Sequence, residues 1–147
     1  MPRERCRLYL ITPPGFDLAT FPRVLGDALG AGDVAAVQLR LKGVPDADVL
    51  KIAATLKPVV QEAGAAFILN DSPDLAAKLG ADGVHVGQSD ASYAEARAIM
   101  GRDRIVGVTC HNSRDLAYAA AEAGADYVAF GAFYATSTKD AQFSAEP

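Results

Sequence analysis

The chain has 147 residues, half of them hydrophobic, which is enough for one compact domain, residues 1–147, with its own core. Its net charge of −4 excludes the basic footprint of nucleic-acid or anionic-membrane binding and favours small-molecule partners. No apolar stretch approaches the roughly 20 residues that cross a bilayer, and the charged start is unlike a signal peptide, so a cytoplasmic location is expected.

Short apolar runs alternate with Ala-rich amphipathic stretches, a pattern typical of α/β proteins with a parallel sheet. In chain order we predict strand 8–11, helix 21–29, strand 35–39, helix 46–63, strand 66–69, helix 72–79, strand 83–86, helix 93–100, strand 105–108, helix 113–123 and strand 127–130. Ser72, followed by Pro73, and Ser113 are predicted helix N-caps. The strands are so short and so continuously apolar that all six are expected to be buried on both faces.

One segment of the chain is repeated. Gly80-Ala81-Asp82-Gly83-Val84 returns as Gly124-Ala125-Asp126-Tyr127-Val128, and in both places a glycine is expected to end a helix shortly before a strand begins. Equal units around a closed sheet are what a TIM (β/α)₈ barrel requires, but a doubly wound open sheet has the same linear pattern. Periodicity therefore leaves both architectures open.

Polar residues gather where the predicted strands end, which is the edge at which ligands bind in either architecture. They are Gln38, Arg40, Lys42, Asn70, Asp71, His85, Gln88, Asp90, Thr109, His111, Thr136, Thr138 and Lys139. Asp71 and Asp90 could share a Mg²⁺, and the cations Arg40, Lys42 and Lys139 suit a pyrophosphate. The alternative for each acid is that it caps the following helix. His85, inside an apolar strand, is expected to be a hydrogen-bonded interior histidine.

Five short segments that contain these polar residues resemble the strand-end motifs of the thiamine-phosphate synthase and thiazole tautomerase superfamily, and their order and spacing along the chain match as well. They are Val-Gln-Leu-Arg-Leu-Lys at 37–42, Leu-Asn-Asp at 69–71, Gly-Val-His-Val-Gly-Gln-Ser-Asp at 83–90, Gly-Val-Thr-Cys-His at 107–111 and Thr-Ser-Thr-Lys at 136–139. The resemblance extends from Leu8 to Lys139. The family commonly has arginine where this chain has Ser72, which removes one cation.

The resemblance implies a Mg²⁺-dependent transferase on a TIM barrel, which joins hydroxymethylpyrimidine pyrophosphate to thiazole phosphate and releases pyrophosphate in thiamine biosynthesis. It implies catalytic roles for Arg40, Lys42 and Lys139, and Mg²⁺ ligation by Asp71 and Asp90. By the same resemblance, Gln38, Asn70 and Thr109 would bind the pyrimidine substrate. Thr136, Ser137 and Thr138 would bind the thiazole phosphate.

A barrel needs eight strands and usually about 200 residues, so the resemblance also implies a barrel truncated after about the sixth strand. If the polypeptide is 147 residues long, we expect weak or absent synthase activity, and two copies could pair as a homodimer. Two other functions stay open: a thiazole tautomerase-like isomerase with His111 as proton carrier, and a non-catalytic phosphate-binding remnant. For His111 the alternative is a residue that starts a helix or packs against the substrate.

Overall fold

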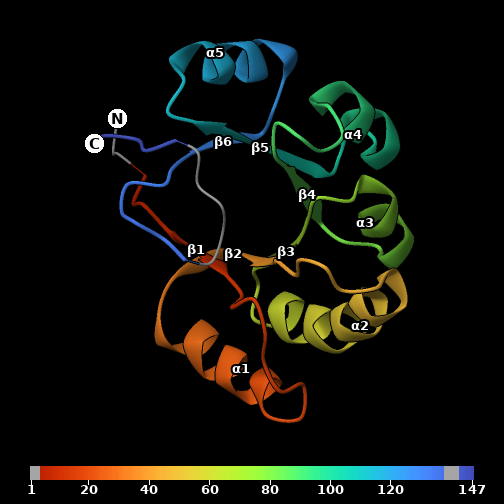
Figure 1. The fold of residues 1–147 in the computed structure, drawn as a ribbon. Helices are drawn as coiled ribbons and strands as arrows, with labels where there is room; N and C mark the ends of the chain where they lie inside the picture. The colour runs from red at the N-terminus through yellow and green to blue at the C-terminus, as the bar shows by residue number, and fades with distance from the viewer. Residues whose placement is uncertain (1–3, 138–142) are drawn as a thin grey trace. The chain divides into compact units, whose positions relative to one another are not determined.

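The computed structural model describes residues 4–137 and 143–147. The chain divides into two compact units, Met1–Ile68 and Leu69–Pro147. Strands and helices alternate along both units, as predicted (Figure 1). Among the described residues, no helix has both the length and the apolar character needed to cross a membrane.

The first unit is built from parallel strands and the helices that connect them. Its elements are β1 (Leu8–Ile11), α1 (Phe21–Ala31), β2 (Val34–Leu39), α2 (Asp46–Glu62) and the start of β3 (Ala66–Asn70). β1 and β2 are parallel, with Ile11 opposite Gln38. Helix α2 packs on β2 and on α1, and it contributes the fully buried Leu56 and Val60 to the core. β2 is almost entirely buried, as its apolar sequence predicts.

The first strand corrects one prediction from the sequence. β1 was expected to be buried on both faces, but Leu8 is 54% and Ile11 is 56% exposed. A parallel strand loses its solvent contact only when other elements cover both of its faces. In this unit α2 packs on β2 and on α1, whereas β1 contacts chiefly its neighbouring strand β2. β6 of the second unit departs in the same way, because its residues are half-buried or exposed.

The second unit continues the same alternation after the end of β3. Its elements are α3 (Pro73–Leu79), β4 (Gly83–Val86), α4 (Tyr93–Met100), β5 (Ile105–His111), α5 (Arg114–Ala123) and β6 (Tyr127–Phe130). β5 pairs in parallel with β4 on one side and with β6 on the other. Helix α4 packs on β4 and β5, and α5 packs on β5 and β6. These parallel strands bring the ends of β4, β5 and β6 to a common edge.

Serine side chains begin the helices of the second unit. Ser72 Oγ accepts a hydrogen bond from the Leu75 N–H at 3.3 Å, and Ser113 Oγ accepts one from the Leu116 N–H at 3.2 Å, so both predicted N-caps are confirmed. Ser92 and Glu95 form a reciprocal capping box at α4. The hydrogen bonds that the Ser92 backbone N–H and hydroxyl donate to the Glu95 carboxylate lower the pKa of Glu95.

The repeated segment marks two equivalent helix ends. Gly80 (φ 68°) and Gly124 (φ 99°) both adopt the left-handed conformation directly after a helix, where a residue with a Cβ would be strained. Each glycine N–H donates back to carbonyls of its helix. A strand follows three residues later in both copies, so the predicted repeat is confirmed as a repeat of local structure.

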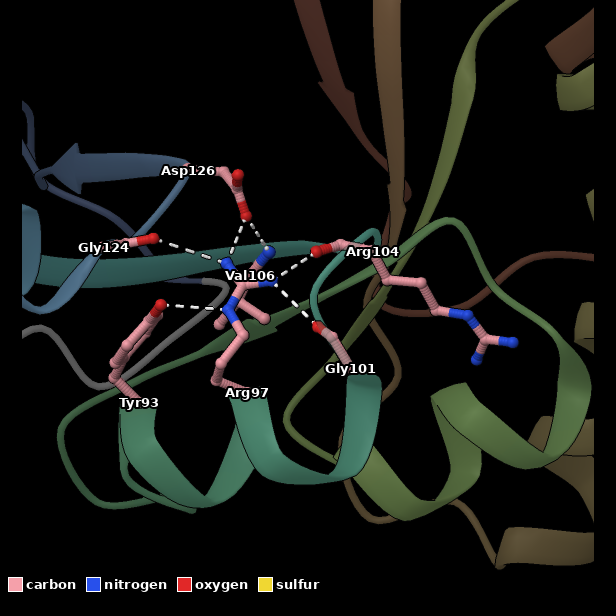
Figure 2. Close-up of polar contacts among 7 residues, drawn as sticks. All are labelled: Tyr93, Arg97, Gly101, Arg104, Val106, Gly124 and Asp126. Atoms are coloured by element: carbon pink, nitrogen blue, oxygen red, sulfur yellow. Dashed lines mark hydrogen bonds and ion pairs between the residues drawn. The ribbon is translucent and has the colours of Figure 1, made fainter.

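Arg97 of α4 joins the segments that lead into β5 and β6 (Figure 2). Its guanidinium donates to the carbonyl oxygens of Arg104 at 2.6 Å and Gly101 at 3.1 Å, and to Asp126 Oδ2 at 2.6 Å. The same carboxylate oxygen of Asp126 also accepts from the Val106 N–H of β5 at 2.8 Å. The amino-terminal ends of these two strands are therefore tied to one helix by a planar cation with several donors.

This network changes the acidity of both charged groups. Partial burial alone would raise the pKa of Asp126, but the hydrogen bonds from Val106 and Arg97 and the charge of Arg97 hold the pKa of Asp126 below its usual value. Burial alone would lower the pKa of Arg97, yet its bonds to Tyr93 and Asp126 raise the pKa of Arg97. Both groups are charged at neutral pH, so the ion pair is intact there.

Candidate functional site

In the first unit, Gln38 is a buried amide held by a tyrosine. Gln38 is only 3% exposed, and its Nε2 donates to the hydroxyl of Tyr9 on β1 at 2.8 Å. A buried amide without a partner would be costly, so this bond fixes the side chain in one orientation. The sequence indicated Gln38 but not Tyr9, whose polar tip on an otherwise apolar strand was the signal that could have identified it.

Arg40 follows β2 directly and is connected to the end of β1. Its backbone N–H donates to Thr12 Oγ1 at 3.1 Å, and the Thr12 N–H donates to the Gln38 carbonyl at 3.0 Å. Gln38 and Arg40 thus belong to one hydrogen-bonded edge through Thr12, a residue that sequence reasoning missed. Lys42, two residues further on, is exposed and precedes Gly43, which has a φ of 68°. This edge of the first unit therefore carries two of the three predicted cations.

In the second unit, Asp71 has an unusual backbone conformation. Its φ is 73°, in the left-handed region that few residues other than glycine, asparagine and aspartate occupy readily. Its N–H donates to the His85 carbonyl at 2.8 Å, and the carbonyl of Asn70 accepts from the Ser72 N–H at 3.0 Å. Backbone strain of this kind is concentrated at functional sites. The hydrogen bond to His85 holds Asp71, in the turn after β3, next to the backbone of β4.

Asp90 stabilises the turn after β4. Its Oδ2 accepts a hydrogen bond from the Gly87 N–H at 2.8 Å, and its own N–H donates to the Gly87 carbonyl at 3.3 Å. Helix α4 is capped by Ser92 and α3 by Ser72, so neither Asp90 nor Asp71 is an N-cap. The capping alternative for the two acids is therefore wrong, because serines occupy both cap positions.

Thr109 lies near the end of β5 with two neighbours from β4 and the loop after it. Its Oγ1 is 2.7 Å from His85 Nε2, and its carbonyl accepts from Gln88 Nε2 at 2.7 Å. His85 is 6% exposed and its Nδ1 is 2.8 Å from the hydroxyl of Tyr127. The prediction of a hydrogen-bonded interior histidine is confirmed. Sequence reasoning did not indicate the Tyr127 hydroxyl as a partner of His85.

His111 is the last residue of β5. Its φ is 50°, its ring lies 5.0 Å from the ring of Phe143, and its carbonyl accepts from the Gly131 N–H at 3.0 Å. Helix α5 begins at Arg114 after the Ser113 cap, so His111 does not start that helix. The helix-start alternative is therefore wrong, and packing of His111 against the substrate stays a prediction.

The last predicted motif is described only in part. Thr136 and Ser137 are exposed, while Thr138 and Lys139 lie outside the described residues. In the described ranges, 4–137 and 143–147, no three residues among His, Cys, Asp and Glu cluster closely enough to hold a metal. A Mg²⁺ that takes one or two carboxylates and fills its other positions with water and substrate oxygens needs no such cluster.

Each unit thus has parallel strands joined by helices, with polar side chains at the carboxyl ends of the strands. In the first unit these are amide, hydroxyl and basic groups, and among the described residues of the second they are amide, hydroxyl and carboxylate groups. This arrangement defines an α/β protein of the class that binds small molecules at that edge. A family model described as thiamine monophosphate synthase matches residues 8–146. The chain belongs to the thiamine monophosphate synthase family.

Individual relatives agree with the family match. A thiamine-phosphate synthase of Rhodospirillum centenum is 61% identical over 142 residues, covering 97% of this chain and 69% of the relative. A thiamine-phosphate synthase of Hyphomonas neptunium is 49% identical over 150 residues, covering 99% of this chain and 68% of the relative. Among solved structures, thiamine phosphate pyrophosphorylase from Pyrococcus furiosus has a TM-score of 0.76 at 29% identity. That similarity covers 90% of this chain, which spans 63% of the Pyrococcus protein.

Proposed function

We propose that the chain contributes to a thiamine-phosphate synthase, a transferase that joins hydroxymethylpyrimidine pyrophosphate to thiazole phosphate and releases pyrophosphate. The observation that carries this proposal is the 61% identity to a thiamine-phosphate synthase over 97% of the chain. We further propose that its strands belong to a (β/α)₈ barrel, in agreement with the similarity to the Pyrococcus furiosus pyrophosphorylase.

The reaction needs charge neutralisation rather than an activated nucleophile. The bond between the pyrimidine methylene carbon and the pyrophosphate oxygen breaks, and its electron pair leaves with the pyrophosphate. The thiazole nitrogen then donates its lone pair to the methylene carbon and forms the new C–N bond. Arg40, Lys42 and Lys139 would offset the charge that grows on the leaving group, and this electrostatic effect is typically the largest catalytic contribution.

The two carboxylates fit a Mg²⁺. Both are hard oxygen donors at the ends of strands, and neither serves as a helix cap, because Ser72 and Ser92 have that role. When bound, the metal would supply further positive charge to the pyrophosphate. Asp71 would be held for this by its turn and its N–H bond to His85, and Asp90 by the bond from Gly87.

The remaining polar residues would bind and orient the two substrates. Gln38, Asn70 and Thr109 would hold the pyrimidine and its pyrophosphate, and the bond from Gln38 to Tyr9 supports a fixed amide. Thr136, Ser137 and Thr138 would receive the thiazole phosphate through hydroxyl and backbone N–H groups. Holding both substrates in line supplies acceleration by removing their translational freedom.

The test is pyrophosphate release by the purified chain with both substrates, with and without Mg²⁺, in wild type and in Asp71→Asn and Asp90→Asn. Asparagine tolerates the left-handed φ at position 71, and its Oδ1 can accept the Gly87 N–H at position 90, so both variants should keep their turns. We expect each to lose more than about tenfold in kcat/KM. Asp103→Asn, an exposed acid in the loop before β5, is the matched control. Pyrophosphate release that does not depend on Mg²⁺ would contradict the metal assignment. Absence of pyrophosphate release both with and without Mg²⁺ would favour the tautomerase-like or the phosphate-binding alternative.

A further inference from the structure

Two side chains of the second unit meet although their strands are not neighbours. His85 on β4 is in register with Gly107 on β5, and Gly107 is in register with Tyr127 on β6. Two strand spacings, about 9.5 Å, therefore separate the backbones of His85 and Tyr127. Their side chains nevertheless approach to 2.8 Å between Nδ1 and the hydroxyl, with ring centroids 5.5 Å apart and an interplanar angle of 24°.

Gly107 makes this approach possible. A Cβ built at position 107 would overlap the Cζ, Cε1 and hydroxyl atoms of Tyr127. The ring of Tyr127 thus crosses β5 through the space that a side chain would fill at any other residue type. A glycine inside a strand usually weakens the strand, and it often marks such a close approach. The glycine is therefore required by the contact between the two flanking strands.

A second hydrogen bond extends this contact toward the carboxyl end of β5. Thr109 lies two residues after Gly107 and so points to the same face of the strand. His85 Nε2 is 2.7 Å from Thr109 Oγ1. His85 thus bridges Tyr127 and Thr109, and all three side chains are linked in one chain of hydrogen bonds that ends at a predicted substrate-binding hydroxyl.

The imidazole determines what the threonine hydroxyl can do. A neutral imidazole has one N–H donor and one acceptor nitrogen. If Nδ1 accepts the proton of the Tyr127 hydroxyl, Nε2 carries the hydrogen and donates it to Thr109 Oγ1. The hydroxyl proton of Thr109 is then directed elsewhere and can be donated to an anionic oxygen. In the opposite tautomer, Thr109 gives its proton to Nε2 and offers a ligand only lone pairs.

We propose that Tyr127 and His85 are positioning residues that hold the Thr109 hydroxyl in one orientation, with its proton available to an oxygen of the pyrophosphate substrate. This inference rests on the proposed function, because that function assigns Thr109 to the substrate. Tyr127 favours the tautomer with hydrogen on Nε2, and that tautomer makes Thr109 a donor. Neither residue needs to touch the substrate.

The first experiment needs no substrate. The chain has two histidines, so long-range ¹H–¹⁵N spectra with a His111→Gln variant assign the His85 ring, and three-bond couplings to the Thr109 methyl carbon report its χ1 angle. In the wild type we expect the tautomer with hydrogen on Nε2 and a single χ1 rotamer. In Tyr127→Phe we expect loss of the tautomer preference and averaging of the Thr109 rotamers. Tyr118→Phe, at a tyrosine that is 68% exposed on α5, is the control and should change neither.

The second experiment measures turnover in a double-mutant cycle. Tyr127→Phe keeps the ring and removes one hydroxyl, and we expect KM for the pyrimidine pyrophosphate to rise about three- to tenfold. In a Thr109→Val background, the same substitution should have no further effect, because Tyr127 acts through the Thr109 hydroxyl. A merely structural role for Tyr127 would give additive effects instead.

The outcomes separate the two proposals. Hydrogen on Nδ1 in the wild type, an unchanged Thr109 rotamer in Tyr127→Phe, or additive kinetic effects would each overturn the positioning role. Absence of turnover in the wild type would count against synthase activity of a 147-residue polypeptide and not against the positioning role. In that case the spectra still decide whether Tyr127 and His85 orient Thr109.

Discussion

Replacement of Arg97 by methionine should destabilise the second unit by about 2–3 kcal/mol. The guanidinium makes two short bonds, to the Arg104 carbonyl and to Asp126 Oδ2, both at 2.6 Å, and a third to the Gly101 carbonyl at 3.1 Å. Its Nε also donates to the Tyr93 hydroxyl at 2.9 Å. Methionine keeps much of the aliphatic stem and removes every donor, so the loss measures the polar network.

The magnitude follows from the exposure of the partners. A net contribution of about 1 kcal/mol for each well-formed bond would give about 4 kcal/mol. The side chain of Arg97 is 21% exposed and that of Asp126 is 46% exposed, so solvent screening reduces the ion pair to less than about 1 kcal/mol. Gly101 is exposed, so its carbonyl can accept a hydrogen bond from water once the arginine is removed, and the loss of that bond costs little. These two corrections bring the expected loss to about 2–3 kcal/mol.

Urea unfolding followed by far-ultraviolet circular dichroism measures this loss. With a slope of about 1–3 kcal/mol per molar urea, the urea concentration at the midpoint should fall by about 0.7–3 M. Arg102→Met, at an exposed arginine in the next loop, is the matched control and should change stability by less than about 0.5 kcal/mol. Arg97→Lys should recover only the charge contact with Asp126, because a single ammonium group cannot bond to Asp126 and to the carbonyls of Gly101 and Arg104 at the same time. A loss below about 1 kcal/mol in Arg97→Met would show that the Arg97 hydrogen bonds contribute little to the stability of the second unit.

Three further predictions follow from the second unit. The pKa of Asp126 is lowered in the folded state, so its contribution to stability is complete above the unfolded carboxyl pKa of about 3.9 and is lost as pH falls through the lower folded pKa. In Asp126→Asn, the free energy of unfolding should therefore depend less steeply on pH in that range. Gly107→Ala should destabilise by about 1–3 kcal/mol or more by displacing the Tyr127 ring, whereas Gly30→Ala, with open space around it, should be neutral or stabilising in the same melts. Burial raises the pKa of the Cys110 thiol, so this thiol should react with a disulfide reagent only after unfolding; reaction of two thiols per native chain would contradict this.

Part of the candidate site followed from local sequence and part did not. The strand-end positions of Asn70, Asp71 and Thr109 were predictable, because a short apolar run followed by polar residues indicates where a parallel strand ends. Their roles toward substrate and metal come from the resemblance and remain predictions. The partners of these residues were not predictable, since they depend on which residues of other strands lie in register. Tyr127 illustrates this, because its contact with His85 depends on both residues being in register with Gly107.

The order of strands and helices, the Ser72 and Ser113 caps and the glycine ends of the repeat were all determined by the sequence alone, since each depends on residues within one turn or one strand. The exposure of Leu8 and Ile11 on β1 could be known only from the folded chain. The same holds for the hydrogen bonds by which Arg97 joins the segments before β5 and β6, and for the contact of Tyr127 with His85 across Gly107. Burial and side-chain contact depend on which other segments pack against a strand or helix, and the residues of that strand or helix do not specify those segments.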